Sequence, residues 1–261
     1  MFLSIDDGST PGRGSLGARR LAGFGAIVAL AGVLGALGAG LGHRVGAWDY
    51  RFGIGMLIGA AGVAALGGLA SLTGALLLLR RDGHRRLVVF GVAGAALGAV
   101  TGALPWSMRT RARDLPAIHD ISTDTDDPPA FVRAAALRRR GDHPVAYEGR
   151  SVANLQRAAY PDLAPLSTPA SPGRAFDAAK AALADLGLAP TDADPSTGRL
   201  EATATTLLFG FKDDVVVRVA PVPGGGARVD VRSMSRVGRH DFGANAERVR
   251  ALLARIRDRL A

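Results

Sequence analysis

Three long runs without a charged residue constrain the fold of this chain more than any other feature. They extend from Leu21 to Gly42, from Ile54 to Leu79 and from Leu87 to Leu104. An α-helix rises about 1.5 Å per residue, so about 20 residues cross a hydrocarbon layer of about 30 Å. We therefore expect transmembrane helices over about 21–42, 54–79 and 87–104, within a membrane region 1–106. The first run exceeds the about 7–15 apolar residues of a signal peptide, so we expect it to be retained.

Arginines next to the spans predict the orientation. On the side of the N-terminus they are Arg13, Arg19, Arg20, Arg80, Arg81, Arg85 and Arg86, and on the opposite side Arg44, Arg51, Arg109, Arg111 and Arg113. Basic residues collect in cytoplasmic loops. We therefore expect a multi-pass protein of the cytoplasmic (inner) membrane, with its N-terminus in the cytoplasm and its C-terminal domain extracytoplasmic.

The net charge of +9 belongs mainly to the membrane region. Residues 1–113 contain twelve arginines and four acidic residues, whereas residues 114–261 contain 20 basic and 19 acidic residues. Binding to a phosphate backbone needs an excess of basic groups, so the sequence argues against a nucleic-acid partner. The chain has no cysteine, which excludes disulfides, thiolate nucleophiles and cysteine-bound metals. No cofactor is expected.

The predicted spans are rich in glycine and lack ionisable side chains. Glycines recur four residues apart as Gly38/Gly42, Gly55/Gly59 and Gly94/Gly98/Gly102. This spacing lets helix backbones approach closely, which favours a compact bundle or self-association through the glycine-rich helices. The alternative is that these glycines only dilute alanine-rich spans. A transporter normally keeps an ionisable group at membrane depth, so we interpret the region as an anchor.

A turn-rich connecting segment over 107–170 follows Trp106, a residue type typical of the membrane interface. Seven prolines lie between positions 116 and 169. Pro128 and Pro129 suit the first turn of a helix, so we expect a short helix near 128–140 with Asp127 as its N-cap. The rest of the segment is expected to wrap the core as extended chain.

Residues 171–261 have the pattern of an α+β domain. Ser171-Pro172 predicts the start of a helix that ends at Gly187. Three runs with a period of two follow, over 200–206, 215–219 and 227–233, and a helix begins near Phe242. The order α-β-β-β-α indicates an antiparallel sheet with helices on one face. The other face is expected to be solvated, because it carries Glu201, Arg218, Arg228, Asp230 and Arg232.

Two polar motifs contain the candidate ligand-binding residues. Ile118–Pro129 includes Asp124, Asp126 and Asp127, and Ser233–Asn245 includes Arg236, Asp241 and Asn245. Carboxylates of the first motif suit acid–base chemistry or a hard cation, and the second suits an anion at a helix start. The alternative is structural: Asx turns in the first motif and Asp241 as a helix cap in the second. The spacing lacks the glycine and glutamate of a calcium loop, so no metal is expected.

Five short motifs resemble a bacterial family classified only as a domain of unknown function. They are Thr123–Pro129, Ala159–Asp162, Glu201–Thr206, Phe209–Asp214 and Ser235-Arg236-x-Gly238-x-x-Asp241-x-Gly243-x-Asn245. The resemblance covers about 115–261 in order, and some members also carry an N-terminal membrane region. It implies no activity, cofactor or catalytic residue, so the catalytic residues stay unknown.

The sequence is compatible with two functions. The first is a non-catalytic, membrane-anchored protein of the cell envelope whose external domain binds a partner protein or an envelope component, for example an anionic one. The second is an envelope enzyme, a hydrolase or transferase acting on an anionic lipid or glycan. That enzyme would use Asp124 or Asp126 as acid or base and Arg236 to hold the anion, so both motifs must meet in one pocket.

Overall fold

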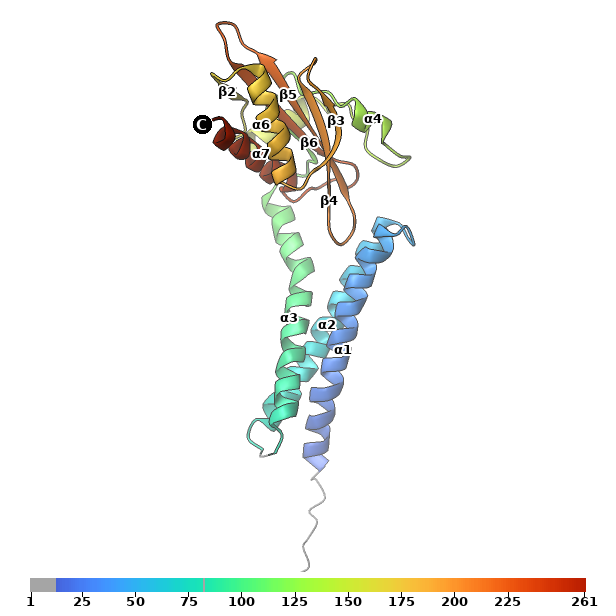
Figure 1. Ribbon diagram of the computed structural model, residues 1–261. Helices are drawn as coiled ribbons and strands as arrows, with labels where there is room; N and C mark the ends of the chain where they lie inside the picture. Colours follow the sequence, from blue (N-terminus) through green and yellow to red (C-terminus); the bar gives the residue numbers. More distant parts are fainter. Residues whose placement is uncertain (1–12, 82) are drawn as a thin grey trace, which may run out of the picture. The chain divides into compact units, whose positions relative to one another are not determined.

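The computed structural model describes residues 13–81 and 83–261 (Figure 1). Residues 1–12 and Asp82 lie outside the described part, and with them the predicted start of the membrane region. The chain divides into two compact units, Met1–Arg109 and Thr110–Ala261, which are described separately.

Three long helices form the first unit: α1 (Arg13–Arg44), α2 (Tyr50–Leu78) and α3 (Arg85–Asp114). All three are long and apolar enough to cross a membrane, so the three predicted apolar helices are confirmed. Asp49 caps α2 by accepting a hydrogen bond from the backbone N–H of Arg51 at 2.8 Å. Helix α3 continues through Pro105 to Asp114, so residues 107–114 are helical and not turn-rich. A proline in a helix removes one backbone hydrogen bond, and the remaining ones sustain α3 here.

Glycines allow close packing within this unit. A Cβ atom at Gly67 or Gly74 of α2 would overlap the backbone of α1, and one at Gly98 of α3 would overlap the backbone of α2. By contrast, a Cβ at Gly55 or Gly59 would meet no heavy atom within 4 Å. The glycines at 94, 98 and 102 therefore serve packing between helices, and self-association through the glycine-rich helices stays a prediction.

The second unit contains a six-stranded antiparallel sheet in the order β1-β6-β5-β4-β3, with β2 also pairing with β6. Its strands are β1 (Asp120–Ser122), β2 (Leu166–Thr168), β3 (Ala189–Asp194), β4 (Arg199–Thr205), β5 (Lys212–Pro221) and β6 (Ala227–Ser235). The three predicted strands are confirmed as β4, β5 and β6. The other three were not predicted, because β1 and β2 have three residues each and the pairing of β3 shifts register between Pro190 and Asp192.

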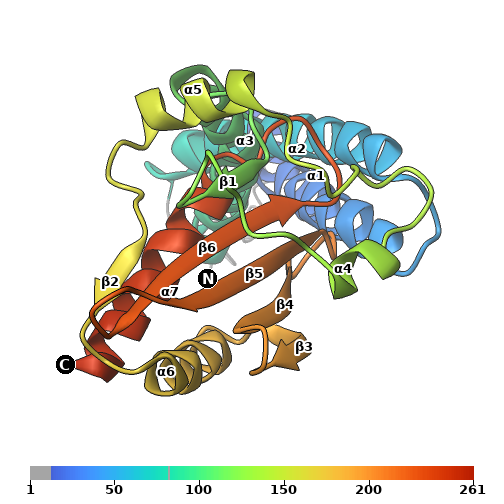
Figure 2. The ribbon, with the colours of Figure 1, turned by 90° about the horizontal axis from the view of Figure 1, so that it is seen from above.

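Helices α6 (Pro172–Asp185) and α7 (Ala244–Leu260) lie on one face of the sheet (Figure 2). Ser171 caps α6, accepting a hydrogen bond from the backbone N–H of Arg174 at 3.4 Å, and Gly187 follows the helix with φ +65°. The main hydrophobic core lies between these helices and the sheet, and it includes Phe176, Val217 and Ile256. The domain is α+β, as its sequence pattern predicts.

The opposite face of the sheet is covered by the segment from Thr123 to Glu148, which carries α4 (Arg133–Ala136) (Figure 2). The prediction of a solvated face is therefore wrong: Glu201 and Asp230 are each only 1% exposed. Alternating charge predicted the two faces correctly, but it does not reveal whether another part of the chain covers the charged one.

The helix expected near 128–140 is a single turn, and Asp127 does not cap it. The carboxylate of Glu201, from β4, accepts the backbone N–H groups of Val132, Arg133 and Ala134 at 2.7–3.0 Å. A carboxylate from a distant strand thus satisfies the donors that a local cap normally satisfies. The adjacent α5 (Arg150–Ala159) has its own buried face, which packs beside β1 through Gln156.

Candidate functional site

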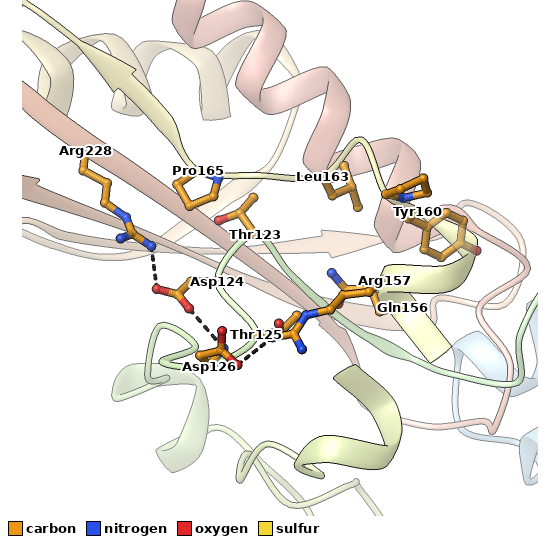
Figure 3. A pocket seen from close by; sticks show the side chains of 11 residues that line it. Thr123, Asp124, Thr125, Asp126, Gln156, Arg157, Tyr160, Leu163, Pro165 and Arg228 are labelled. Carbon is orange, nitrogen blue, oxygen red and sulfur yellow. Dashed lines mark hydrogen bonds and ion pairs between the residues drawn. The ribbon is translucent and has the colours of Figure 1, made fainter. Parts of the chain in front are cut away.

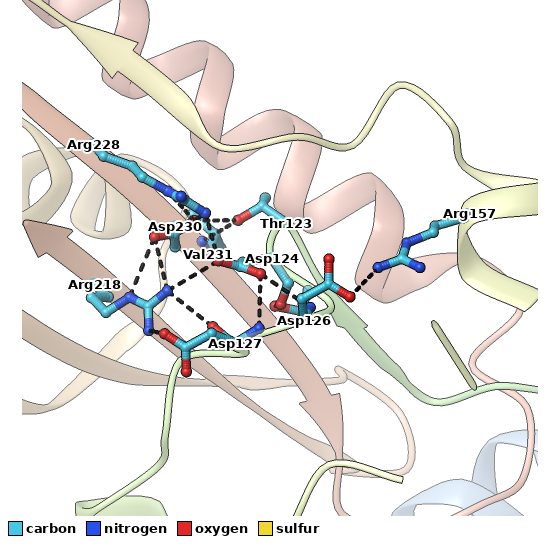
Figure 4. A network of polar contacts seen from close by, with 10 residues as sticks. Thr123, Asp124, Asp126, Asp127, Arg157, Arg218, Arg228, Asp230 and Val231 are labelled. Atoms are coloured by element: carbon cyan, nitrogen blue, oxygen red, sulfur yellow. Dashed lines mark hydrogen bonds and ion pairs between the residues drawn. The ribbon is translucent and has the colours of Figure 1, made fainter. Parts of the chain in front are cut away.

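The first polar motif folds over the charged face, where Asp124 meets two arginines (Figure 4). Its Oδ2 atom accepts a hydrogen bond from Nη2 of Arg228 at 2.5 Å and lies 3.5 Å from Nη2 of Arg218. Both guanidinium groups also bind the buried carboxylate of Asp230, each with a contact of 3.1 Å. The four side chains form a compact, partly buried network of alternating charge.

The second oxygen of Asp124 stabilises the turn. Its Oδ1 atom accepts the backbone N–H groups of Asp126 at 3.1 Å and Asp127 at 2.9 Å. Burial raises the pKa of Asp124, but the two backbone donors and the arginines Arg228 and Arg218 outweigh it, so the net shift is downward. Asp124 is therefore held as a carboxylate, which does not suit a general acid at neutral pH.

The other two aspartates of the motif lie at its exposed edge. Asp127 binds Nη1 of Arg218 at 2.8 Å, and its backbone oxygen accepts from Nη2 of the same residue at 2.9 Å. Asp126 binds Nη2 of Arg157, from α5, at 2.6 Å. The motif thus connects three elements of the domain: β5, β6 and α5.

A cavity of about 400 Å³ opens beside this motif (Figure 3). One side is formed by Thr123 to Asp126, and the other by the segment from Tyr160 to Pro165. Arg157 and Arg228 lie at opposite ends of the cavity in Figure 3. Volumes of about 300–1,000 Å³ are typical of small-molecule sites.

Arg236, from the second motif, lies elsewhere. Its guanidinium group makes two hydrogen bonds to the carboxylate of Asp214, at 2.9 and 2.7 Å, and a third to the backbone oxygen of Leu137 at 3.2 Å. Arg138 also approaches Asp214, at 3.2 Å. With its side chain 8% exposed, Arg236 is bound within the fold and does not line the cavity.

Asp241 and Asn245 organise the start of α7. Asp241 accepts the backbone N–H groups of Gly243 at 2.9 Å and Asn245 at 3.0 Å. The N-cap residue is Gly243, so Asp241 supports the helix start from two residues before the cap. The side chain of Asn245 is fully buried, and it donates to the backbone oxygen of His119 at 3.1 Å and to Oγ of Ser235 at 2.9 Å. Burial raises the pKa of Asp241.

The six predicted site residues therefore separate into three places. Asp124, Asp126 and Asp127 share one network, Arg236 belongs to a second around Asp214, and Asp241 and Asn245 form a third at α7. None of the last three lines the cavity beside Asp124. The enzyme hypothesis requires Asp124 or Asp126 to face Arg236, and the structure does not bring them together.

Sequence reasoning missed the most buried ion pair of the domain. Arg232, 2% exposed, makes two hydrogen bonds to Asp120, at 2.9 and 2.7 Å. Its guanidinium carbon lies 4.8 Å from the ring centroid of Phe131 and 5.4 Å from that of Tyr147. In the sequence, Arg232 is recognisable only as a charged residue within an alternating strand. That pattern does not identify Asp120 as its ion-pair partner.

Two histidines stack beside this network. The rings of His119 and His143 have centroids 3.9 Å apart, and Nε2 of His143 lies 3.0 Å from the backbone oxygen of Gly238. Burial, and then the neighbouring His143, lower the pKa of His119. Within residues 13–81 and 83–261, no three His, Asp or Glu side chains are grouped as metal ligands.

Comparison with known proteins identifies one related family. The family described as "Protein of unknown function (DUF1499)" matches residues 120–256, which include every strand of the sheet and nearly all of α7. No curated protein matches the chain.

Proposed function

The chain belongs to the DUF1499 family, and from this premise we propose that it is a membrane-anchored binding protein of the cell envelope. Three apolar helices hold it in the bilayer, and the C-terminal domain binds a partner protein or an envelope component in the cavity beside Asp124. The arginine distribution supports an extracytoplasmic domain and a cytoplasmic N-terminus.

One observation carries the proposal: the cavity is bordered by charged side chains that still have exposed polar atoms. The side chain of Arg157 is 49% exposed, that of Arg228 is 40% exposed and that of Asp126 is 88% exposed. Other charged side chains of the domain are instead buried in ion pairs inside the fold, namely Asp214, Asp120 and Arg232. A binding site needs polar groups that fix a ligand's orientation, and such groups gather at this cavity.

A photo-crosslinking amino acid at Thr125 tests the proposal in cells that express the full chain. Thr125 lines the cavity, so we expect irradiation to yield a defined adduct. The matched control is the same amino acid at Asp258, an exposed position of α7 away from the cavity. Equal labelling at both positions, or no adduct at Thr125, would overturn the binding proposal.

A reporter fusion tests the orientation separately. Alkaline phosphatase fused after Ala261 folds only after export, so we expect an active reporter. Neutral replacements of Arg80, Arg81, Arg85 and Arg86 leave three arginines against five and should weaken or invert the orientation. An inactive fusion to the unmodified chain, together with a fluorescent cytoplasmic reporter at the same position, would place the domain in the cytoplasm.

A further inference from the structure

The charges around the cavity beside Asp124 balance one another. Arg228 pairs with Asp124, with 2.5 Å between Nη2 and Oδ2, and Arg157 pairs with Asp126, with 2.6 Å between Nη2 and Oδ1. An anion entering here would approach two carboxylates, and a cation would approach two guanidinium groups. Repulsion between the ligand's charge and these like-charged groups disfavours binding. The expectation of an anionic component therefore does not fit the cavity, and a neutral ligand does.

These pairs leave hydrogen-bonding capacity unused. Asp126 binds Arg157 through Oδ1, and its Oδ2 atom makes no hydrogen bond to the described residues. Arg157 donates from Nη2, and Arg228 donates from Nε and Nη2, so N–H groups of both guanidinium groups remain for a ligand. Donors at both ends and a carboxylate acceptor suit hydroxyl groups, because a hydroxyl both donates and accepts.

The wall opposite the aspartates is mainly apolar. Leu163 and Pro165 lie across the cavity from the aspartates (Figure 3). Leu163 is held in the main hydrophobic core, so this wall is fixed in place. Apolar surface combined with a few placed polar groups is typical of small-molecule sites. It gives the C–H face of a sugar ring a contact surface while the ring hydroxyls meet Arg157, Asp126 and Arg228.

We propose that the cavity between Asp126, Arg157 and Arg228 binds a neutral, hydroxyl-rich saccharide, such as an uncharged segment of an envelope glycan. This inference rests on the proposed binding function and names the chemical class of its ligand. Arg157 and Asp126 bind the hydroxyl groups as a donor–acceptor pair, and Pro165 packs against the ring above the buried Leu163.

Saturation-transfer NMR with the full chain in nanodiscs tests this proposal. The probes are the neutral tetrasaccharides of chitin, cellulose and maltose, an anionic tetrasaccharide of uronic acids, and inorganic phosphate. We expect at least one neutral tetrasaccharide to bind, and to bind more tightly than the uronate or phosphate. Replacing Arg157→Met should weaken that binding about tenfold, because it removes a charged hydrogen-bond donor.

Arg259→Met is the matched control. Arg259 forms an ion pair with Asp185 at 2.6 Å and is about as exposed as Arg157, but it lies on α7 away from the cavity. We expect the Arg259→Met variant to bind the saccharide with the same affinity as the unmodified chain. Equal losses in both variants would mean that the saccharide does not bind in this cavity, which overturns the inference.

The outcomes separate this inference from the proposed function. Binding of the uronate or of phosphate in preference to the neutral saccharides overturns the ligand class, while the crosslink at Thr125 still supports binding in the cavity. If no saccharide binds and the adduct at Thr125 is a protein, the inference fails and the proposed function stands. If no saccharide binds and Thr125 yields no adduct, both fail.

Discussion

The two faces of the same sheet are buried by different means. On β5, Val215, Val217 and Val219 point to α6 and α7, whereas Asp214 and Arg218 point to the segment from Thr123 to Glu148. The first face excludes water mainly with apolar side chains, and its polar contacts, such as Arg248 with Asp213 at 2.8 Å, lie at the start of α7. The second buries charged groups, and each has a specific partner that comes from a distant part of the chain.

Because of this difference, the two faces differ in how strictly they constrain the side chains that pack on them. Apolar packing is non-directional, so many side chains of similar volume satisfy it. A buried charge needs its partner at hydrogen-bond distance, because an unpaired one bears the full cost of desolvation. The charged face therefore fixes the path of the segment that covers it: Asp120 pairs with Arg232 on β6, and Glu201 on β4 holds the start of α4.

Arg232→Met is expected to have the largest effect on the charged face. It leaves the carboxylate of Asp120, 1% exposed, without its cation, and removal of one partner of a buried pair costs about 3–5 kcal/mol. Hydrogen exchange of β6 amides in the full chain measures this loss as a lower opening free energy. The double variant Arg232→Met/Asp120→Leu should recover much of it. If the double variant recovers none of the lost opening free energy, stacking of Arg232 on Phe131 contributes more to stability than its ion pair with Asp120.

Glu201→Gln tests the long-range cap of α4. The carboxylate accepts three backbone N–H groups, and an amide offers only one acceptor oxygen. We expect a loss of about 1–2 kcal/mol, the usual range for a lost helix cap, with faster exchange confined to residues 130–137. Faster exchange throughout the sheet would indicate that Glu201 supports the whole fold and not this turn.

Ile256→Val probes the apolar face. Ile256 is fully buried between α7 and the sheet, so deletion of one methylene should cost about 0.5–1.5 kcal/mol. Hydrogen exchange of β5 and β6 amides measures this loss as an opening free energy, which can be compared directly with that of Arg232→Met. A loss as large as that of Arg232→Met would contradict the proposed difference between the two faces.

The charged side also predicts a pH dependence that valines cannot produce. Burial, and then His143, lower the pKa of His119, so the unfolded chain binds a proton more readily than the folded one. The contribution of His119 to the free energy of unfolding is therefore complete above about pH 6.5. It is lost as the pH falls below that value, by at most about 1.4 kcal/mol per pH unit.

His119→Phe keeps a ring against His143 and removes this titration. Amide exchange of β6 between pH 8 and pH 5.5, corrected for intrinsic rates, should show a smaller pH dependence in the variant than in the unmodified chain. Asp241 is present in both proteins, so its titration contributes to the pH dependence of both. Identical pH dependence in the two would exclude His119 as its origin.

The main strands and helices could be predicted because their signals are local. The run Val215–Val219 alternates, Ser171-Pro172 starts a helix, and each of the three apolar helices is long enough for a bilayer crossing. The candidate site was predicted only in part. Asp124 and Asp126 do border a cavity, but Arg157 and Arg228, which complete it, carry no local pattern that distinguishes them from other surface arginines.

The sequence by itself determined the membrane spans, the three central strands, the helix that precedes them and the helix that follows, because hydrophobic periodicity and helix caps act over a few residues. Only the tertiary structure decided that the charged face is covered, that Glu201 caps α4 and that Arg236 binds Asp214 and not the first motif. These outcomes depend on pairing between groups far apart in the chain. Many carboxylates and arginines are chemically equivalent as partners, so only the folded backbone selects among them.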